Sequence, residues 1–373
     1  MLRSYLLAAG LSAVSIGMAA SAGCGGTDVA GPGGAGGADA GPPAVHALPP
    51  DAPPPKAPDG ATDVTFAIRK LYLGDTKRDG TPDKVNGWKE YGFDLDGKIS
   101  TAVSTDLCKP RNNAPVKNVY PDGLNGIDNS FGRNILPIIL GLSATAATSI
   151  NDSITKGSFT IMLSMGKLGA GKEYNPILTK LYGGATLLDA MMMPVAPKWD
   201  GSDTWPVVPE LLNNPMDISS AKVQFDKSYL VDNTWVSGSK GTINLNLSVQ
   251  GFTLSLTVAA ALISVDLSAD HKTGTKGTIA GVLATDTLTS ELKKVAGGFD
   301  PTLCMGPTID SIIAQIEQAS DIMRDGTAGD PTKTCDGISI GLGFDVAAVQ
   351  LGKIAPAAMG GGDPCAAKDG GTD

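Results

Sequence analysis

Alternating apolar and polar positions predict β-strands in several parts of the chain. Residues 64–69 and 158–165 each alternate with the period of two that is typical of half-buried strands. Residues 263–267 show the same pattern, and after a glycine-containing loop residues 278–283 return with it. Shorter strands are expected on both sides of residues 94–97. The chain is therefore predicted to build most of its core from sheet.

The strongest of these patterns lies between Gly241 and Val258. Apolar side chains stand at odd positions before Gln250-Gly251 and at even positions after it. A two-residue hairpin loop at Gln250-Gly251 requires this change of parity, and it places all the apolar side chains on one face. The pairs that follow are Val249–Phe252, Leu247–Leu254, Leu245–Leu256 and Ile243–Val258. A single strand with a bulge at Gly251 is the alternative.

Three segments carry apolar residues at helical spacing instead. The first predicts a helix over residues 137–155. The second is a helix capped by Asp286 or Thr287 and ended by glycines at 297–298, and the third is capped by Thr308. These helices are few and the strands many. The predicted fold is mainly β, an antiparallel β-sandwich with a few peripheral α-helices.

The N-terminus has the pattern of an export signal. Arg3 precedes an apolar stretch over residues 5–20, which is shorter than the roughly 20 residues that a helix needs to cross a bilayer. Residues 1–23 are therefore predicted to be a removed signal peptide. The run Ser21-Ala22-Gly23-Cys24 resembles the lipobox of bacterial lipoproteins, in which the cysteine is acylated, although that family usually has Leu where Ser21 stands. Ordinary cleavage after Ala22, giving a soluble secreted protein, is the alternative.

Low-complexity sequence follows the signal. Residues 24–60 are rich in Gly, Ala and Pro and are predicted to form a disordered tether. Residues 61–355 would be the β-rich exported domain, with a division into two subdomains near residue 200 left open, and residues 356–373 a flexible tail. With Cys24, this organisation resembles uncharacterised tethered surface lipoproteins of Gram-negative bacteria. The resemblance implies an outer-membrane or cell-surface location and attachment to the membrane through Cys24, but it implies no activity.

The cysteine count agrees with this location. Besides Cys24 the chain has four cysteines, at Cys108, Cys304, Cys335 and Cys365. An unpaired thiol is unfavourable in an oxidising compartment, and acylation of Cys24 leaves an even number for disulfides. Four cysteines allow three pairings. The expected one joins Cys304 to Cys335 and Cys108 to Cys365.

Charge and histidine content exclude several classes of function. The chain has 29 basic and 38 acidic residues, and removal of Arg3 with the signal leaves 28 against 38, a net charge of −10. Such an acidic surface argues against a nucleic-acid partner. The chain has 2 histidines, His46 in the predicted tether and His271 in a polar, solvent-exposed turn. Sites built from several imidazoles, such as three-histidine zinc, are therefore excluded.

Acidic turns are the first candidates for chemistry. Calcium is bound by six to eight oxygen ligands, and Asp-x-Asp-Gly turns recur in its binding loops. Asp-Gly is also an ordinary turn sequence, so solvated turns without an ion are the alternative. No cofactor other than calcium is expected. The candidate ligands are Asp75, Asp79 and Asp83 in one cluster and Asp94 and Asp96 in a second; a third cluster holds Asp122, Asn125 and Asp128.

Two other motifs suggest ligands. Residues 166–172 have the spacing of a phosphate-binding loop, but Glu173 stands where that motif needs Ser or Thr, which argues against nucleotide. Trp199 and Trp205 lie in a polar, turn-rich segment. They are candidates for stacking on a carbohydrate or another small ligand, and anchoring of the loop on a sheet is the alternative.

Together these observations favour a non-catalytic surface protein. We expect an exported, membrane-tethered lipoprotein that binds a ligand or partner, with a carbohydrate or a protein at the cell surface as the partner, or that has a role in the cell envelope. No catalytic residues can be assigned. The alternative is a secreted carbohydrate-active enzyme, in which two Asp carboxylates would act in a groove of the β-sandwich.

Overall fold

A computed structural model of the chain describes residues 44–249, 252–357 and 365. The chain divides into two compact units, Met1–Pro43 and Ala44–Asp373, and all described residues belong to the second. The predicted signal peptide, Cys24 and most of the predicted tether lie outside the described residues. Residues on both sides of position 200 belong to the same unit, so the division considered there is not seen.

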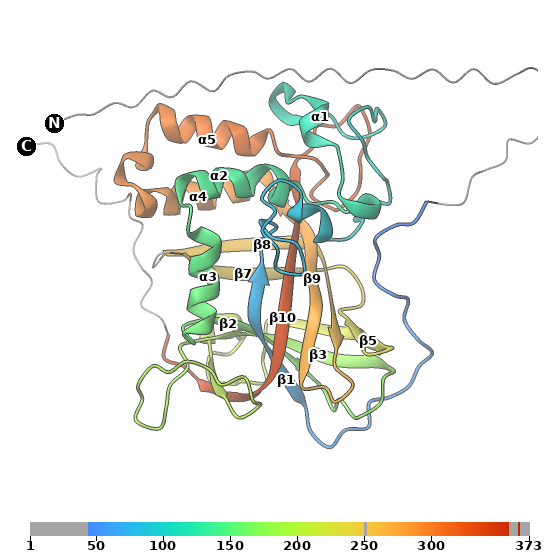
Figure 1. Ribbon diagram of the computed structural model, residues 1–373, viewed down its shortest axis with the longest axis vertical. Helices are drawn as coiled ribbons and strands as arrows, with labels where there is room; N and C mark the ends of the chain where they lie inside the picture. The colour runs from blue at the N-terminus through green and yellow to red at the C-terminus, as the bar shows by residue number, and fades with distance from the viewer. Residues whose placement is uncertain (1–43, 250–251, 358–364, 366–373) are drawn as a thin grey trace, which may run out of the picture. The chain divides into compact units, whose positions relative to one another are not determined.

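The described part is mainly β, as predicted (Figure 1). Its strands form one 10-stranded hydrogen-bonded sheet. The strands are β1 Val64–Tyr72, β2 Thr160–Met165, β3 Tyr174–Gly184, β4 Thr204–Val207, β5 Val223–Val231, β6 Thr234–Val236, β7 Gly241–Val249, β8 Phe252–Leu267, β9 Thr273–Ala284 and β10 Gly337–Ile354.

The pairings of this sheet close on themselves. Following the partners leads from β10 through β1, β2, β3, β5, β6, β8 and β9 back to β10, always antiparallel. Strand β4 lies between β3 and β10, parallel to β10, and β7 pairs with β8. The pairing therefore joins all the strands in one sheet and does not divide them into the two separate sheets of the expected sandwich.

The central hairpin is confirmed in detail. Strands β7 and β8 pair in the predicted register, and all four expected pairs occur: Val249–Phe252, Leu247–Leu254, Leu245–Leu256 and Ile243–Val258. The turn itself, residues 250–251, lies outside the described residues. The parity change in the sequence was sufficient because only one register keeps every apolar residue on the same face.

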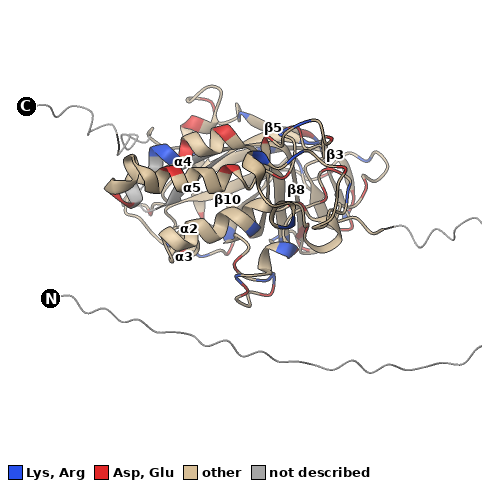
Figure 2. Ribbon diagram, turned by 90° about the horizontal axis from the view of Figure 1, so that it is seen from above, with Lys and Arg blue, Asp and Glu red and all other residues tan. Residues whose placement is uncertain are grey.

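Helices gather at one end of the sheet and beside it (Figure 1). The α-helices are α1 Val116–Val119, α2 Leu136–Leu142, α3 Ala146–Thr155, α4 Thr285–Phe299 and α5 Pro307–Glu317; short 3-10 turns occur at Gly87–Glu90, Arg111–Asn113, Leu124–Gly126, Pro209–Leu211 and Pro301–Cys304, and a π-turn at Phe131–Ile135. Figure 2 shows acidic residues on both α4 and α5, and basic residues on α4. Both helices are where the sequence predicts them, although Ala284 and Gly306, and not Asp286, Thr287 or Thr308, occupy the N-cap positions.

The helix predicted over residues 137–155 is broken into α2 and α3. The segments Phe131–Leu142 and Ala146–Thr155 meet at an angle of 86°. A straight helix over this range would be about 28 Å long. The bend lets Leu136 at one end and Ile154 at the other pack into the same core. Among the described residues no single helix is long and apolar enough to cross a bilayer, and this bent pair passes that test only as a pair, by length and composition.

Several elements were not predicted. Residues 94–97 form a turn flanked by loops instead of strands, and β3 and β4 lie in a stretch that shows no clear pattern in the sequence. Strand β10 was missed because it is buried along most of its length and therefore lacks the alternation of a half-buried strand. Its Gly343 lies directly under the ring of Tyr91, where a Cβ atom would clash.

The folded unit begins earlier than predicted. The sequence placed residues 24–60 in a disordered tether, but residues 44–60 lie against the domain and form hydrogen bonds with it. The carbonyl of Pro50 accepts a hydrogen bond from the Tyr229 hydroxyl at 2.7 Å, and that of Pro53 accepts one from the Asn175 amide at 2.6 Å. Proline lacks an N–H but keeps its carbonyl acceptor, so a segment with little apolar surface is still fixed by side-chain donors.

The disulfide pairing differs from the expected one. Cys108 is bonded to Cys335 and Cys304 to Cys365. The chain around Cys108 runs beside the segment before β10, where the N–H of Cys335 donates to the carbonyl of Lys109 at 2.9 Å. Sequence distance gave no information about this approach, because the two segments are brought together only by the closing of the sheet.

We predict that the two disulfides contribute unequally to stability. Replacing both Cys108 and Cys335 with Ala should lower the free energy of unfolding by about 2–5 kcal/mol. Replacing Cys304 and Cys365 should cost about 1 kcal/mol less, because the sequence separation is 61 residues instead of 227. Urea unfolding of the two double variants measures the difference, and non-reducing peptide mapping checks the pairing. Equal losses, or a larger loss for the second pair, would contradict the prediction.

Candidate functional site

An Asp-x-Asp-Gly turn after the Gly87–Glu90 helix forms the centre of the candidate site. Gly97 has φ +79, a conformation that favours glycine, and its N–H donates to Asp94 Oδ1 at 2.7 Å. Asp96 Oδ1 accepts the Lys98 N–H at 2.8 Å. The turn thus uses one oxygen of each carboxylate to fix its own backbone, and it presents two carboxyl groups on one short loop.

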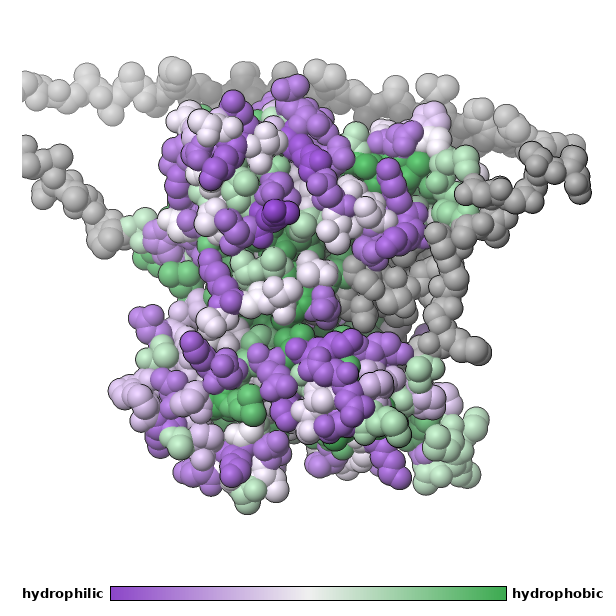
Figure 3. Space-filling model, turned by 180° about the vertical axis from the view of Figure 1, so that it is seen from behind, coloured by the Kyte–Doolittle hydropathy of each residue, from purple (hydrophilic) through white to green (hydrophobic). Residues whose placement is uncertain are grey.

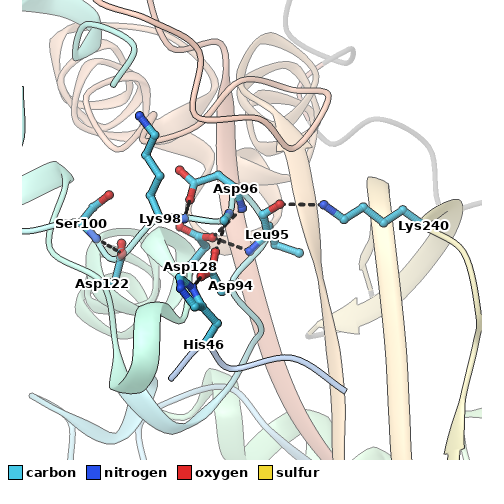
Figure 4. A network of polar contacts seen from close by, with 10 residues as sticks. His46, Asp94, Leu95, Asp96, Lys98, Ser100, Asp122, Asp128 and Lys240 are labelled. Atoms are coloured by element: carbon cyan, nitrogen blue, oxygen red, sulfur yellow. Dashed lines mark hydrogen bonds and ion pairs between the residues drawn. The ribbon is translucent and has the colours of Figure 1, made fainter. Parts of the chain in front are cut away.

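Asp128 joins this turn from a later loop (Figure 4). Its Oδ2 accepts the N–H groups of Leu95 at 2.7 Å and Asp96 at 3.3 Å. Ligand oxygens of Asp94, Asp96 and Asp128 all lie within 4.8 Å of one another. We call these three residues the carboxylate cluster. The structure therefore combines members of the second and third acidic groups of the sequence, which were predicted as separate turns.

The N-terminal segment closes the cluster on one side. His46 Nδ1 forms a hydrogen bond with Asp94 Oδ2 (Figure 4). The neighbouring Ala47 is held on both sides, since its carbonyl accepts the Asp94 N–H at 2.8 Å and its N–H donates to the Asn125 carbonyl at 2.8 Å. Sequence reasoning missed His46 because the Gly- and Pro-rich composition around it predicted a tether.

Burial makes the cluster electrostatically costly. Asp94 and Asp128 have only 4% and 3% of their surface exposed. Burial raises the pKa of Asp96 to about 6, against the stabilising effect of the Lys98 N–H. Burial also raises the pKa of Asp128 well above its usual range, and the charges of Asp96 and Asp122 add to that effect.

Two further carboxyl groups extend the negative charge. Burial raises the pKa of Asp122 to about 8 and that of Asp321 to about 7, and the charge of Asp96 adds to both shifts. Asp122 accepts the Ser100 N–H, and Asp321 accepts the N–H and the hydroxyl of Ser339. The sequence gave no signal for Asp321, which lies in the connection between α5 and β10.

The basic side chains nearby are engaged with other acceptors. Lys98 donates to Asp106 at 2.6 Å, Lys240 to the Leu95 carbonyl at 2.6 Å, and Arg133 to the Pro121 carbonyl at 2.7 Å. Burial and the neighbouring carboxylates disfavour the ionised forms of Asp96 and Asp128, and a bound cation would offset that cost. Carboxylate oxygens on a tight Asp-Gly turn are suitable ligands for a hard cation such as Ca²⁺, and Asp94, Asp96 and Asp128 are the residues that could hold it.

The first predicted acidic group does not take part. Asp79 Oδ1 accepts the Thr81 N–H at 2.8 Å, and this hydrogen bond lowers the pKa of Asp79. Asp83 Oδ1 accepts the Asn86 N–H at 2.9 Å. In the part of the chain that the structure describes, Asp75, Asp79 and Asp83 form no group of converging ligand atoms. They behave as ordinary turn residues, which was the alternative interpretation.

The tryptophan pair anchors a loop. Trp205 has 0% of its surface exposed, and its indole N–H donates to the Ala185 carbonyl at 2.6 Å. The half-buried Trp199 packs against it, with ring centroids 5.5 Å apart. Trp205 therefore cannot stack on a sugar from solvent, and the prediction of a carbohydrate platform is wrong for this residue.

The loop with phosphate-binding spacing is filled from within. Asp59 reaches Gly169 so closely that a Cβ atom on this glycine would overlap its carboxylate, and the same carboxylate accepts a hydrogen bond from Tyr174. His271, predicted to be solvated, is instead buried, and its Nδ1 lies 2.9 Å from the Gly169 carbonyl. An acidic side chain thus occupies the space in which a phosphate would have to bind.

Comparison with known proteins gave no match to a protein-family model, to a curated protein or to a solved structure.

We predict that calcium stabilises the domain. A cation bound only by the folded state at about 100 times its Kd would add about 2.7 kcal/mol to the free energy of unfolding. Thermal melts in EDTA and in millimolar calcium should differ, and Asp128→Asn should remove the difference. Asp79→Asn is the matched control and should keep it. Identical melts of the unmodified protein in both buffers would exclude the site.

Stability without metal should decrease as the pH rises. The pKa of Asp122 is raised from 3.8 to about 8, so the folded chain keeps a proton that the unfolded chain has lost in this interval. Its contribution is complete below pH 3.8 and is lost as the pH rises through 8. Urea unfolding in EDTA over this range should show the decline, and Asp122→Asn should flatten it. In the control Asp79→Asn, the slope of the free energy of unfolding against pH should stay unchanged. If Asp122→Asn left this slope equally steep, the assignment to Asp122 would be refuted.

Proposed function

We propose that this chain is an exported lipoprotein, tethered through Cys24, whose folded unit is a non-catalytic binding domain of the cell surface or envelope. Its two disulfides indicate an oxidising, extracytoplasmic environment. They are the observation that carries the proposal. They use four of the five cysteines, and the fifth, Cys24, is the one that the sequence marks for acylation.

The position of the folded unit in the chain supports a displayed domain. The described residues start at Ala44, so residues 24–43 lie between the proposed anchor and the first described residue. With the flexible-coil behaviour that the Gly-rich composition predicts, a segment of that length would have a root-mean-square span of about 25 Å. This span holds a domain close to a membrane surface while leaving it free to meet partners.

The character of the site supports binding instead of catalysis. One oxygen of Asp94 accepts a hydrogen bond from the Gly97 N–H, the other is hydrogen-bonded to His46, and Asp128 accepts from the backbone of the same turn. Such carboxylates suit a structural cation, which would fix the N-terminal segment to the domain. The alternative is a carbohydrate-active enzyme with two Asp carboxylates in a groove of the sheet, and the burial of Trp205 means that this side chain would not supply a stacking platform for its substrate.

The proposal predicts a specific mature mass and location. Expressed in a Gram-negative host, the mature protein should begin at an acylated Cys24, retain two disulfides, and fractionate with membranes. Cys24→Ala should remove the lipid and release the protein to the soluble fraction. Ser21→Leu is the matched control, since it makes the lipobox more like that of the family and should preserve acylation. A mature chain that begins at Gly23 and carries no lipid would show the anchor to be wrong.

A further inference from the structure

A cleft of about 140 Å³ opens at the edge of strand β5. On one side it is lined by residues 222–226, which enter and begin β5. On the other side it is lined by the segment that leads from β6 into β7, at Ser237, Ser239, Gly241 and Thr242. The cleft therefore lies between the start of β5 and the connection that leads from β6 into β7.

The residues that line the cleft show how it is oriented. Neighbouring residues of a strand point to opposite faces, so a pocket on one face of a sheet is lined by alternate residues. Here residues 222–226 line the cleft consecutively. The cleft must therefore run along the edge of β5, beside its backbone N–H and C=O groups.

Strand pairing gives the same result independently. Strand β5 pairs with β6 only from Tyr229 to Val231, whereas its partners from Val223 to Ser228 lie on β3. At Gly238, which has φ +88, the segment after β6 still contacts β5. The contact is so close that a Cβ atom at this position would clash with the Lys227 carbonyl. Beyond this point they diverge. Among the described residues, β7 also pairs on one edge only, with β8.

The side chains beside this edge are divided between its two faces. Val223 and Phe225 are buried, whereas Lys222, Gln224 and Asp226 are exposed. Figure 1 shows β5 beside β3, and Figure 3 shows hydrophobic and hydrophilic side chains mixed over the rear surface of the molecule. Buried apolar and exposed polar residues alternate along this stretch of β5, so its unpaired backbone is the distinctive feature of the cleft.

We propose that this cleft binds an extended segment of a partner protein, which adds a strand to the edge of β5 from Lys222 to Asp226. The inference rests on the proposed binding function and names its site and the class of its partner. Only another extended backbone matches the spacing of donors and acceptors along a strand edge. The cleft would hold the first residues of that strand, which then continues beside the open edge of β7.

The same geometry fixes the chemistry of the segment. Side chains on its inner face must be small and apolar, because they would lie beside Val223 and Phe225. On its outer face an acidic residue should stand opposite Lys222 and a basic residue opposite Asp226. The Lys222 ammonium donates to the Glu210 carbonyl at 2.8 Å, which holds its charge near the mouth of the cleft. A segment with this alternation is favoured in one direction along β5.

The test uses the mature protein and two capped peptide probes, Glu-Val-Thr-Val-Lys and Lys-Val-Thr-Val-Glu, which have the same composition and opposite order. One of them should protect from hydrogen exchange those β5 amides between residues 222 and 226 that point away from β3. In an extended peptide the valine amides and the threonine amide point to opposite edges, so only one of these two sets can bond to β5. N-methylation of that set should abolish the protection. The proposal would be overturned if neither probe at millimolar concentration protected the β5 amides. It would also be overturned if the peptide still bound both after N-methylation of its valine amides and after N-methylation of its threonine amide.

A charge-reversal variant tests the register. Asp226→Lys should weaken the better probe by about two- to fivefold, in line with an exposed ion pair. Exchanging the peptide lysine for glutamate should restore binding. The matched control Asp310→Lys, on α5, should change neither value. If Asp226→Lys bound the better probe and its lysine-to-glutamate version equally well, the proposed register on β5 would be refuted.

The remaining outcomes are also decisive. Protection of the β5 amides that depends on protein concentration without any peptide would show that a second copy occupies the edge, which contradicts a separate partner. Each measurement is repeated on Cys24→Ala. Loss of the anchor without loss of peptide binding would affect only the proposed location, whereas loss of peptide binding by a correctly acylated protein would overturn only this inference.

Discussion

Strand β10 pairs with β1 along one edge and with β9 along the other, and this double pairing closes the sheet. The partners come from the first and the later parts of the folded unit, so the closure brings together residues that are almost three hundred positions apart in sequence. The other features follow from it. It brings the segment before β10 beside Cys108, and it places Gly341 of β10 against the Tyr91 backbone, next to the turn that carries Asp94 and Asp96. Because the closure joins distant segments, the two disulfides limit the entropy that it must overcome.

The carboxylate cluster is the main place where ionisable groups are buried in the otherwise apolar interior of the domain. Burial raises the pKa values of Asp96, Asp122 and Asp321, while the basic side chains around them donate to other groups. Natural sequences retain such arrangements where a function or a bound ion offsets the desolvation. Here the cluster also holds the N-terminal segment through His46. A cation at this position would therefore connect the segment that leads to the proposed anchor with the core of the domain, and this connection would matter for a domain displayed on a tether.

Parts of the fold could be predicted because their signals are local. The β7–β8 hairpin followed from the parity change at residues 250–251, and α4 and α5 followed from apolar spacing and neighbouring glycines. Strand β10 and the break between α2 and α3 could not be predicted, because both depend on what covers each face. For the site, the sequence supplied Asp94, Asp96 and Asp128 but separated Asp128 from the other two. It gave no signal for His46 or Asp321, since neither lies in a motif and each gains its role only from a contact across the fold.

The sequence by itself determined the mainly β class, the central hairpin register, the number of cysteines available for disulfides and the composition of the N-terminal segment. These properties depend on periodicity, counting and composition, which act over a few residues. The tertiary structure alone decided the disulfide pairing, the grouping of the carboxylates, the burial of Trp205 and His271, and the open edge of β5. Each of these depends on which distant segment becomes a neighbour. That choice is made by the closure of the whole sheet, and no local pattern encodes it.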